Sequence, residues 1–301
     1  MIIAYGTILA TLMGLAFGSF LNVCLSRWPE GESVVKPRSH CRKCGHVLAW
    51  WENVPLVSWL ALRARCRECK ARIGWRYPLV ELAVGALWGW QAWQFLSTSF
   101  NPELPNLITY QTVAATLGRI TFYWLLVALA VLDAEHLWLP NWLTLPGTAL
   151  GLGFTLLGAG YDRRLLGDVP LEPLRYAVAR EAFSSLIAIV AAAGLVLLIR
   201  WSYRLLRGHD GMGLGDAKLM AMLGAWLGLP GALVAFALAV LMGGVAALAL
   251  LAVPAARRGP EHWTMIKLPL GTFLCIGGLA SALWGQQIVT LYLRSMGLAG
   301  Y

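Results

Sequence analysis

Apolar residues recur in long stretches along nearly the whole sequence, separated by short polar segments. A helix needs about 20 such residues to cross roughly 30 Å of hydrocarbon. Stretches near that length predict eight membrane-spanning helices, at residues 2–25, 77–97, 109–132, 140–160, 183–201, 213–228, 230–253 and 268–293. The third stretch contains Arg119 and the sixth is short and rich in glycine, so counts of six or seven spans stay open.

One polar region interrupts this pattern, from Ser26 to Arg76. We therefore expect three parts: a first transmembrane helix at residues 1–25, a loop at 26–76 and a transmembrane domain at 77–301. Of the 301 residues, 58% are hydrophobic and only 13% are charged, which leaves too few polar groups to cover a soluble globule. The predicted fold class is all-α, a polytopic membrane protein with about eight transmembrane helices.

The distribution of basic residues predicts how the spans are oriented, because cytoplasmic loops are enriched in Lys and Arg. Of the 24 basic residues, 11 lie between Arg27 and Arg76, so this loop is expected in the cytoplasm. The basic groups at 200–207 and 257–267 then also face the cytoplasm, whereas the segment at 97–107 has none and faces outward. Because the basic residues that give the net charge of +9 flank predicted spans, we expect them to contact membrane lipid and expect no binding of nucleic acid.

Four of the six cysteines lie in this loop as two C-x-x-C pairs with 21 residues between them. A two-residue gap lets both thiolates of a pair face one ion, and two pairs complete a tetrahedral shell of four sulfurs. Such a shell leaves no open position, so a Zn²⁺ ion here would be structural rather than catalytic. Disulfides or free thiols are the alternative, although a cytoplasmic loop lies in a reducing compartment. The predicted zinc ligands are Cys41, Cys44, Cys66 and Cys69.

Two aspartates are the candidate catalytic residues, since ionisable groups inside spans are costly and mark functional sites. Asp133 ends the apolar run that begins at Phe122, and Asp216 lies in a glycine-rich stretch. The predicted topology puts both at cytoplasmic ends of helices, at similar depth. Two carboxyls there can share a proton, so that one activates water while the other polarises a carbonyl. Alternatively, each aspartate marks a helix interface, with Asp216 stabilised near a helix N-terminus.

Three glycines lead into Asp216, at Gly211, Gly213 and Gly215. Their lack of side chains is expected to let a substrate backbone approach the carboxylate and to let the helix begin there.

Several motifs stand in a recognisable order. The stretch from Leu132 to Pro146 contains Asp133, and the stretch from Gly213 to Trp226 contains Asp216. They occur with the four cysteines and with three further segments, Gly18–Val23, Arg76–Leu82 and Pro269–Phe273. In these motifs the chain resembles the type IV prepilin peptidases, also called prepilin leader peptidase/N-methyltransferases, which are GxGD-type membrane aspartyl proteases. It departs from the pattern at Asn141, where many relatives have a third acidic residue.

The resemblance implies that Asp133 and Asp216 cut basic leader peptides from type IV prepilins or pseudopilins, at the cytoplasmic face of the bacterial inner membrane. It also implies N-methylation of the newly exposed residue, usually phenylalanine, with S-adenosylmethionine as methyl donor. The sequence has no strand-flanked G-x-G-x-x-G for a separate Rossmann domain, so the donor site has to be built from the loop and neighbouring spans. Glu81 could contact donor or substrate, or simply reach water.

Two other functions stay open on the sequence. One is a peptidase without methyltransferase activity. The other is a proton-coupled transporter that uses the aspartates as a proton relay and the cysteine loop as a gate, although the inverted repeats typical of transporters are missing. The sequence leaves the oligomeric state open.

Overall fold

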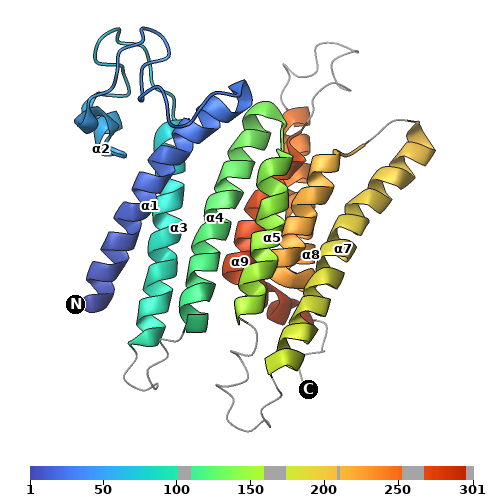
Figure 1. Cartoon of the computed structure of the whole chain (residues 1–301). Coiled ribbons are helices and arrows are strands. Elements are labelled where there is room, and N and C mark those ends of the chain that lie inside the picture. The colour runs from blue at the N-terminus through green and yellow to red at the C-terminus, as the bar shows by residue number, and fades with distance from the viewer. Residues whose placement is uncertain (101–109, 159–173, 209–210, 253–267, 296–301) are drawn as a thin grey trace. The chain divides into compact units, whose positions relative to one another are not determined.

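The computed structural model describes residues 1–100, 110–158, 174–208, 211–252 and 268–295 (Figure 1). These residues form helices and loops and contain no β-strand, which confirms the all-α prediction for this part of the chain. They divide into two compact units, Met1–Ala128 and Leu129–Tyr301. Of the basic residues expected at the cytoplasmic face, Arg257, Arg258 and Lys267 lie outside the described ranges.

Five of the described helices are long and apolar enough to cross a membrane, judged by length and composition. They are α1 (Ile2–Arg27), α4 (Tyr110–His136), α7 (Leu174–Arg207), α8 (Leu214–Ala252) and α9 (Leu270–Ser295). The second and fourth predicted spans coincide with two further helices, α3 (Arg76–Ser99) and α5 (Asn141–Gly158), which are outside those five. A polytopic membrane protein is therefore supported, and the count of eight spans stays a prediction.

Helix α8 covers the ranges predicted for two separate spans, 213–228 and 230–253. Its backbone leaves the helical region at Gly228, where φ is 67° and ψ is 177°, and Pro230 follows two residues later. Proline lacks the N–H that a helix interior needs, and glycine tolerates positive φ, so the pair bends the chain here. The boundary expected between the two spans therefore coincides with a break in the helical backbone at Gly228, where two helices meet at a kink.

The first unit is built on the close packing of α1 against α3 (Figure 1). A Cβ atom added at Gly14 would lie 2.9 Å from the Val84 carbonyl oxygen, and one at Gly18 would lie 2.7 Å from the Cα of Glu81. Small residues allow this approach, as expected in membranes, where van der Waals packing rather than hydrophobic burial holds helices together. Beyond the end of α1 the cysteine loop contains η1 (Trp28–Glu30), η2 (Trp50–Asn53) and α2 (Val57–Ala61).

In the second unit α8 packs against α5, α7 and α9 (Figure 1). Glycines again allow close approach: a Cβ atom at Gly224 would lie 2.6 Å from the Ala188 carbonyl oxygen of α7, and the indole Nε1–H of Trp226 donates to the Gly147 carbonyl oxygen of α5 at 2.8 Å. The side of α9 facing α8 is likewise occupied by a glycine, Gly277. These contacts hold α8, whose first turn carries Asp216, against α5, α7 and α9.

Candidate active site and metal centre

Both predicted catalytic aspartates are buried in the second unit. Asp133 lies in the last turn of α4 with 5% of its surface exposed, and Asp216 lies in the first turn of α8 with 8% exposed. The two carboxylates interact electrostatically with each other, and both also interact with the buried thiol of Cys275 on α9. The structure thus brings together the two aspartates, which are 83 positions apart in the sequence.

Asp133 is held by the N-terminus of α9. The backbone N–H of Thr272 donates to Asp133 Oδ2 at 2.7 Å, and the Thr272 hydroxyl contacts the same oxygen at 3.2 Å. The Thr272 hydroxyl also donates to the Ala130 carbonyl oxygen at 3.0 Å, and the Gly271 N–H gives Asp133 a further backbone hydrogen bond. Free N–H groups at a helix N-terminus favour a carboxylate, so α9 fixes both the position and the orientation of Asp133.

Asp216 is held by the start of its own helix. Its Oδ2 accepts a hydrogen bond at 3.1 Å from the backbone N–H of Gly213, just before α8 begins. A carboxylate that binds an N–H in the first turn stabilises the helix start, so the structural role offered by the alternative interpretation of Asp216 is present. That role leaves the second carboxylate oxygen, Oδ1, free of the capping bond.

Leu139 packs between the start of α8, which carries Asp216, and the start of α9, which holds Asp133. A Cβ atom at Gly215 would lie 3.1 Å from the Leu139 side chain, and one at Gly271 would lie 2.9 Å from it. The Cβ position at Gly211 is likewise close to Tyr203, at 2.6 Å. Two of the three glycines near Asp216 therefore face side chains of the protein here, and close approach of a substrate backbone at these glycines stays a prediction.

Lys218 and Asn141 are joined by a hydrogen bond from the lysine Nζ to the asparagine Oδ1 at 2.5 Å. The contact links α8 to the first residue of α5, at an exposed position. Asn141 is the position at which the chain is expected to depart from the pattern of the family that it resembles. In this chain the partner of Lys218 is a neutral amide, so this contact does not neutralise the charge of the ammonium group.

Sequence reasoning did not identify Gly271 and Thr272 as partners of Asp133. The available signal in the sequence is the segment Pro269–Phe273, to which local pattern assigns no partner. A proline followed by glycine and threonine is typical of a helix start. Nothing local, however, links this start to a carboxylate 139 positions earlier in the chain.

The four predicted zinc ligands form one cluster in the first unit. Their sulfur atoms all lie within 4.8 Å of one another, with Cys41 Sγ 3.8 Å from Cys69 Sγ and Cys44 Sγ 4.0 Å from Cys66 Sγ. All four cysteines are free thiols, because these separations are far longer than a disulfide bond of about 2.05 Å. Four sulfurs at about 2.3 Å from a tetrahedral zinc would lie roughly 3.8 Å apart, which agrees with the cluster.

The two cysteine pairs are held by matching backbone turns. In the first, the Cys41 N–H donates to the His46 carbonyl and the Gly45 N–H to the Cys41 carbonyl, both at 2.8 Å. The second repeats this pattern five and four residues after Cys66, at 2.8 and 3.1 Å. The fourth residue after each first cysteine, Gly45 or Lys70, has positive φ, at 75° and 57°. Each turn thereby points its two sulfurs at a common centre.

The local environment also favours a thiolate at Cys41. Partial burial opposes ionisation, but hydrogen bonds from the Cys44 and Lys43 backbones, together with neighbouring thiols, outweigh it and lower the pKa of Cys41 to about 6. Backbone N–H groups that point at sulfur stabilise the ionised form, which is the form that binds metal. At Cys44 a backbone hydrogen bond from His46 lowers the pKa, but burial and the neighbouring thiols outweigh it and raise the pKa to about 11. The cluster therefore fits a structural zinc ion in donor type and spacing.

Models of two protein families match the chain. One, described as "Bacterial Peptidase A24 N-terminal domain", covers residues 12–95, and the other, "Type IV leader peptidase family", covers residues 120–248. The first match includes the four cysteines and the second includes both aspartates. No solved structure is significantly similar to the chain.

Curated relatives match almost the full length. A protein of Pseudomonas aeruginosa is 36% identical over 95% of this chain and 93% of its own, one of Aeromonas salmonicida is 33% identical over 96% and 94%, and one of Burkholderia pseudomallei is 37% identical over 94% and 86%. Each is named "Prepilin leader peptidase/N-methyltransferase". The family matches and these relatives together show that the chain belongs to the type IV leader peptidase family.

Proposed function

We propose that this protein is a membrane aspartyl endopeptidase that removes the leader peptide of type IV prepilins or pseudopilins. It also N-methylates the new N-terminal residue with S-adenosylmethionine. The observation that carries the peptidase assignment is the pair of buried, electrostatically interacting carboxylates of Asp133 and Asp216. The names of the relatives support both activities.

The dyad performs hydrolysis with one carboxylate ionised and the other protonated. The ionised carboxylate takes a proton from water, whose oxygen attacks the carbonyl carbon of the scissile peptide bond. The protonated carboxyl gives its proton to the carbonyl oxygen, which forms a tetrahedral intermediate. The intermediate collapses with cleavage of the C–N bond. The leaving amine takes the proton that the first carboxyl gained from water, and one hydroxyl of the intermediate returns its proton to the second carboxylate as the product carboxyl forms. Thr272 and the start of α9 keep Asp133 oriented throughout.

The proposal includes the arrangement in the membrane. Eight spans would put Asp133 and Asp216 at the cytoplasmic face of the bacterial inner membrane, with the first span at residues 1–25, the loop at 26–76 and the peptidase domain at 77–301. Support comes from the basic loop and from the five long apolar helices of the described part of the chain. A prepilin with a cytoplasmic leader and an embedded helix presents its scissile bond at that depth.

The cysteine cluster is proposed to bind one structural Zn²⁺ ion through Cys41, Cys44, Cys66 and Cys69. We expect purified protein to contain about one zinc per chain by mass spectrometry of metals, and Cys66→Ser to lose it, because a tetrahedral site needs all four ligands. Cys275→Ser is the control, since Cys275 is also buried and has no place in the cluster. Wild-type protein without zinc, purified without chelator, would contradict the assignment.

The function is tested by incubating purified protein in lipid nanodiscs with a prepilin and a methyl-labelled S-adenosylmethionine. Cleavage with label on the new N-terminus is the expected result. Cleavage without label would support a peptidase lacking methyl transfer. The absence of cleavage, combined with proton flux in proteoliposomes, would support a transporter instead.

A further inference from the structure

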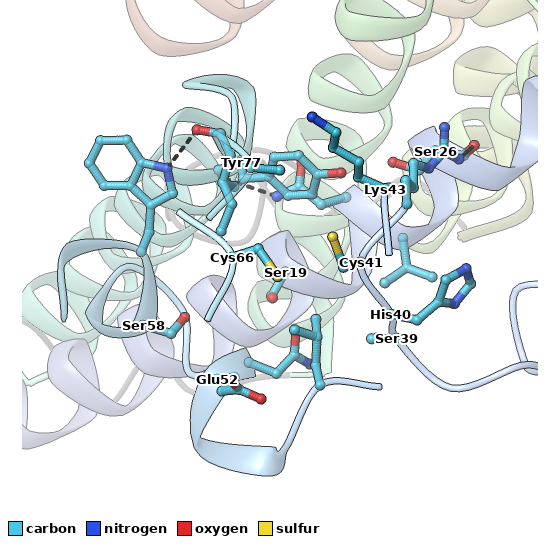
Figure 2. Close-up of a pocket in the computed structure, with 18 of the residues that line it drawn as sticks. Ser19, Ser26, Ser39, His40, Cys41, Lys43, Glu52, Ser58, Cys66 and Tyr77 are labelled. Atoms are coloured by element: carbon cyan, nitrogen blue, oxygen red, sulfur yellow. Dashed lines mark hydrogen bonds between the residues drawn. The ribbon is translucent and has the colours of Figure 1, made fainter. Parts of the chain in front are cut away.

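A cavity of about 660 Å³ lies in the first unit, between the facing ends of α1 and α3 and the cysteine loop (Figure 2). Ser19 and Asn22 line it from α1, Tyr77 and Glu81 from α3, and Glu52 from η2. Its volume lies within the roughly 300–1,000 Å³ typical of small-molecule sites. Neither aspartate of the dyad lines it, so leader hydrolysis leaves this cavity without a role.

Two buried oxygens of its lining residues have no hydrogen-bond partner: Asn22 Oδ1 and Glu52 Oε1. Asn22 is 2% exposed, and its amide N–H donates to the Tyr77 carbonyl oxygen at 2.9 Å. Glu52 is 5% exposed and uses only Oε2, which accepts from the Ala49 N–H at 2.8 Å and lies 3.1 Å from His46 Nε2. A buried acceptor without a partner is costly, so both oxygens indicate a ligand that brings hydrogen-bond donors.

The carboxylates of the cavity indicate the charge of that ligand. The Ala49 N–H, together with His46 and Arg67, holds the pKa of the Glu52 carboxyl below its ordinary value. Glu81 lies within α3 and accepts the Leu56 N–H at 2.8 Å, which ties the loop to the helix. Basic side chains also line the cavity, namely Arg27, Arg42, Lys43, Arg67 and Arg72. A lining with charges of both signs favours a ligand that has both a cationic group and a carboxylate, as the methionine part of S-adenosylmethionine does.

Aromatic side chains complete the lining. Trp59 and Tyr77 both line the cavity, and the Trp59 indole is fixed by its Nε1–H bond to the Ile73 carbonyl oxygen at 3.3 Å. Aromatic faces stack with nucleobases. The combination of stacking faces, unpartnered oxygen acceptors and carboxylates matches an adenine ring, ribose hydroxyls and a sulfonium with an ammonium group.

We propose that this cavity is the site of the methyl donor, and that Asn22, Glu52 and Glu81 bind S-adenosylmethionine there. The inference rests on the proposed methyl transfer and goes beyond it by assigning the donor site to residues of this chain. Cys41 and Cys66 also line the cavity, so the metal cluster supports one of its walls (Figure 2).

The test is direct binding of labelled S-adenosylmethionine to the full chain in nanodiscs, measured by equilibrium dialysis. Glu81→Gln and Glu52→Gln keep the side-chain shape and an acceptor oxygen but remove the charge, and each is expected to weaken binding about tenfold. Glu68→Gln is the matched control, because Glu68 is an exposed carboxylate of the same loop that does not line the cavity, and it should bind as wild type. Zinc content and size-exclusion profiles confirm that each variant is folded.

The outcomes separate this inference from the proposed function. Ultraviolet crosslinking of the label to peptides within residues 19–81, with displacement by S-adenosylhomocysteine, would support the site. Wild-type affinity in both Gln variants would overturn it while leaving methyl transfer intact. If a mature pilin peptide displaced the label and S-adenosylhomocysteine did not, the occupant of the cavity would be the methyl acceptor. That result would also overturn the inference. A wild-type protein that cleaves prepilin but neither binds nor transfers the methyl group would end the methyltransferase half of the proposed function.

Discussion

Replacing either aspartate of the dyad by asparagine is expected to lower the rate of leader cleavage by about 10³-fold or more. An amide cannot take a proton from water, and it cannot return one to the carbonyl oxygen or the leaving amine. Because both carboxyls act in one step, the double variant Asp133→Asn/Asp216→Asn should be no slower than the more impaired single variant. The measurement is kcat on a purified prepilin, read from the ratio of cut to uncut substrate.

The matched control is Glu135→Gln, which changes a partly exposed carboxylate two residues from Asp133 at the same end of α4. It should cleave at the wild-type rate. Methyl transfer to a pilin that has already been cut reports on the other proposed site and should persist in both asparagine variants. If either asparagine variant retained more than about a tenth of the wild-type rate, the residue concerned would have no part in proton transfer.

The features that the sequence predicted correctly are those coded by local pattern. Apolar runs of membrane length specify helices whatever their neighbours, because a helix satisfies its own backbone hydrogen bonds. The two C-x-x-C pairs likewise converge on one centre. Local sequence sets the turn of each pair, and all four sulfurs are metal ligands of the same type. Asp133 and Asp216 are candidates on the same local grounds, because a charge at the end of an apolar run is unusual, and their catalytic role stays a prediction.

Local pattern was less informative about span boundaries. Gly228 and Pro230 indicated a break between two spans, and the backbone does leave the helical region at Gly228. Whether the helices on its two sides are separate membrane spans stays a prediction. Helix α3 fits a predicted span and yet carries Glu81 and Gln91, both buried, which reduce its mean apolar character. Whether such a helix crosses the membrane depends on neighbours that cover its polar groups.

Contacts between distant segments could not be predicted at all. Thr272 holds Asp133 across 139 positions, and Glu81 holds the Leu56 N–H across 25. Each contact depends on how the helices pack. The local sequence indicates only an ordinary role for each residue, as a helix start or an interfacial carboxylate, and so does not reveal its distant partner. The cavity beside Glu81 also arises only from packing, since Gly14 and Gly18 bring α1 close enough to α3 to place Asn22 beside Tyr77.

Gly271 is expected to be the most sensitive position outside the dyad itself. A Cβ atom there would lie 2.8 Å from both the Cγ and the Oδ2 of Asp133, and 2.9 Å from the Leu139 side chain. Real Cβ atoms almost never come closer than 3.0 Å to other heavy atoms, so Gly271→Ala must displace the Asp133 carboxylate from the Thr272 N–H. Displacement of a catalytic group by about 1 Å costs roughly 10²-fold in rate.

We therefore expect Gly271→Ala to lower kcat for leader cleavage about 100-fold while changing KM little, because Asp133 is misplaced and the rest of the substrate path is untouched. Gly244→Ala is the matched control: Gly244 also lies in a helix of the second unit, but a Cβ atom there meets nothing within 4 Å. Both variants should show similar thermal unfolding in nanodiscs. A Gly271→Ala enzyme that cleaves as fast as Gly244→Ala would mean that the N-terminus of α9 does not position Asp133 for the reaction.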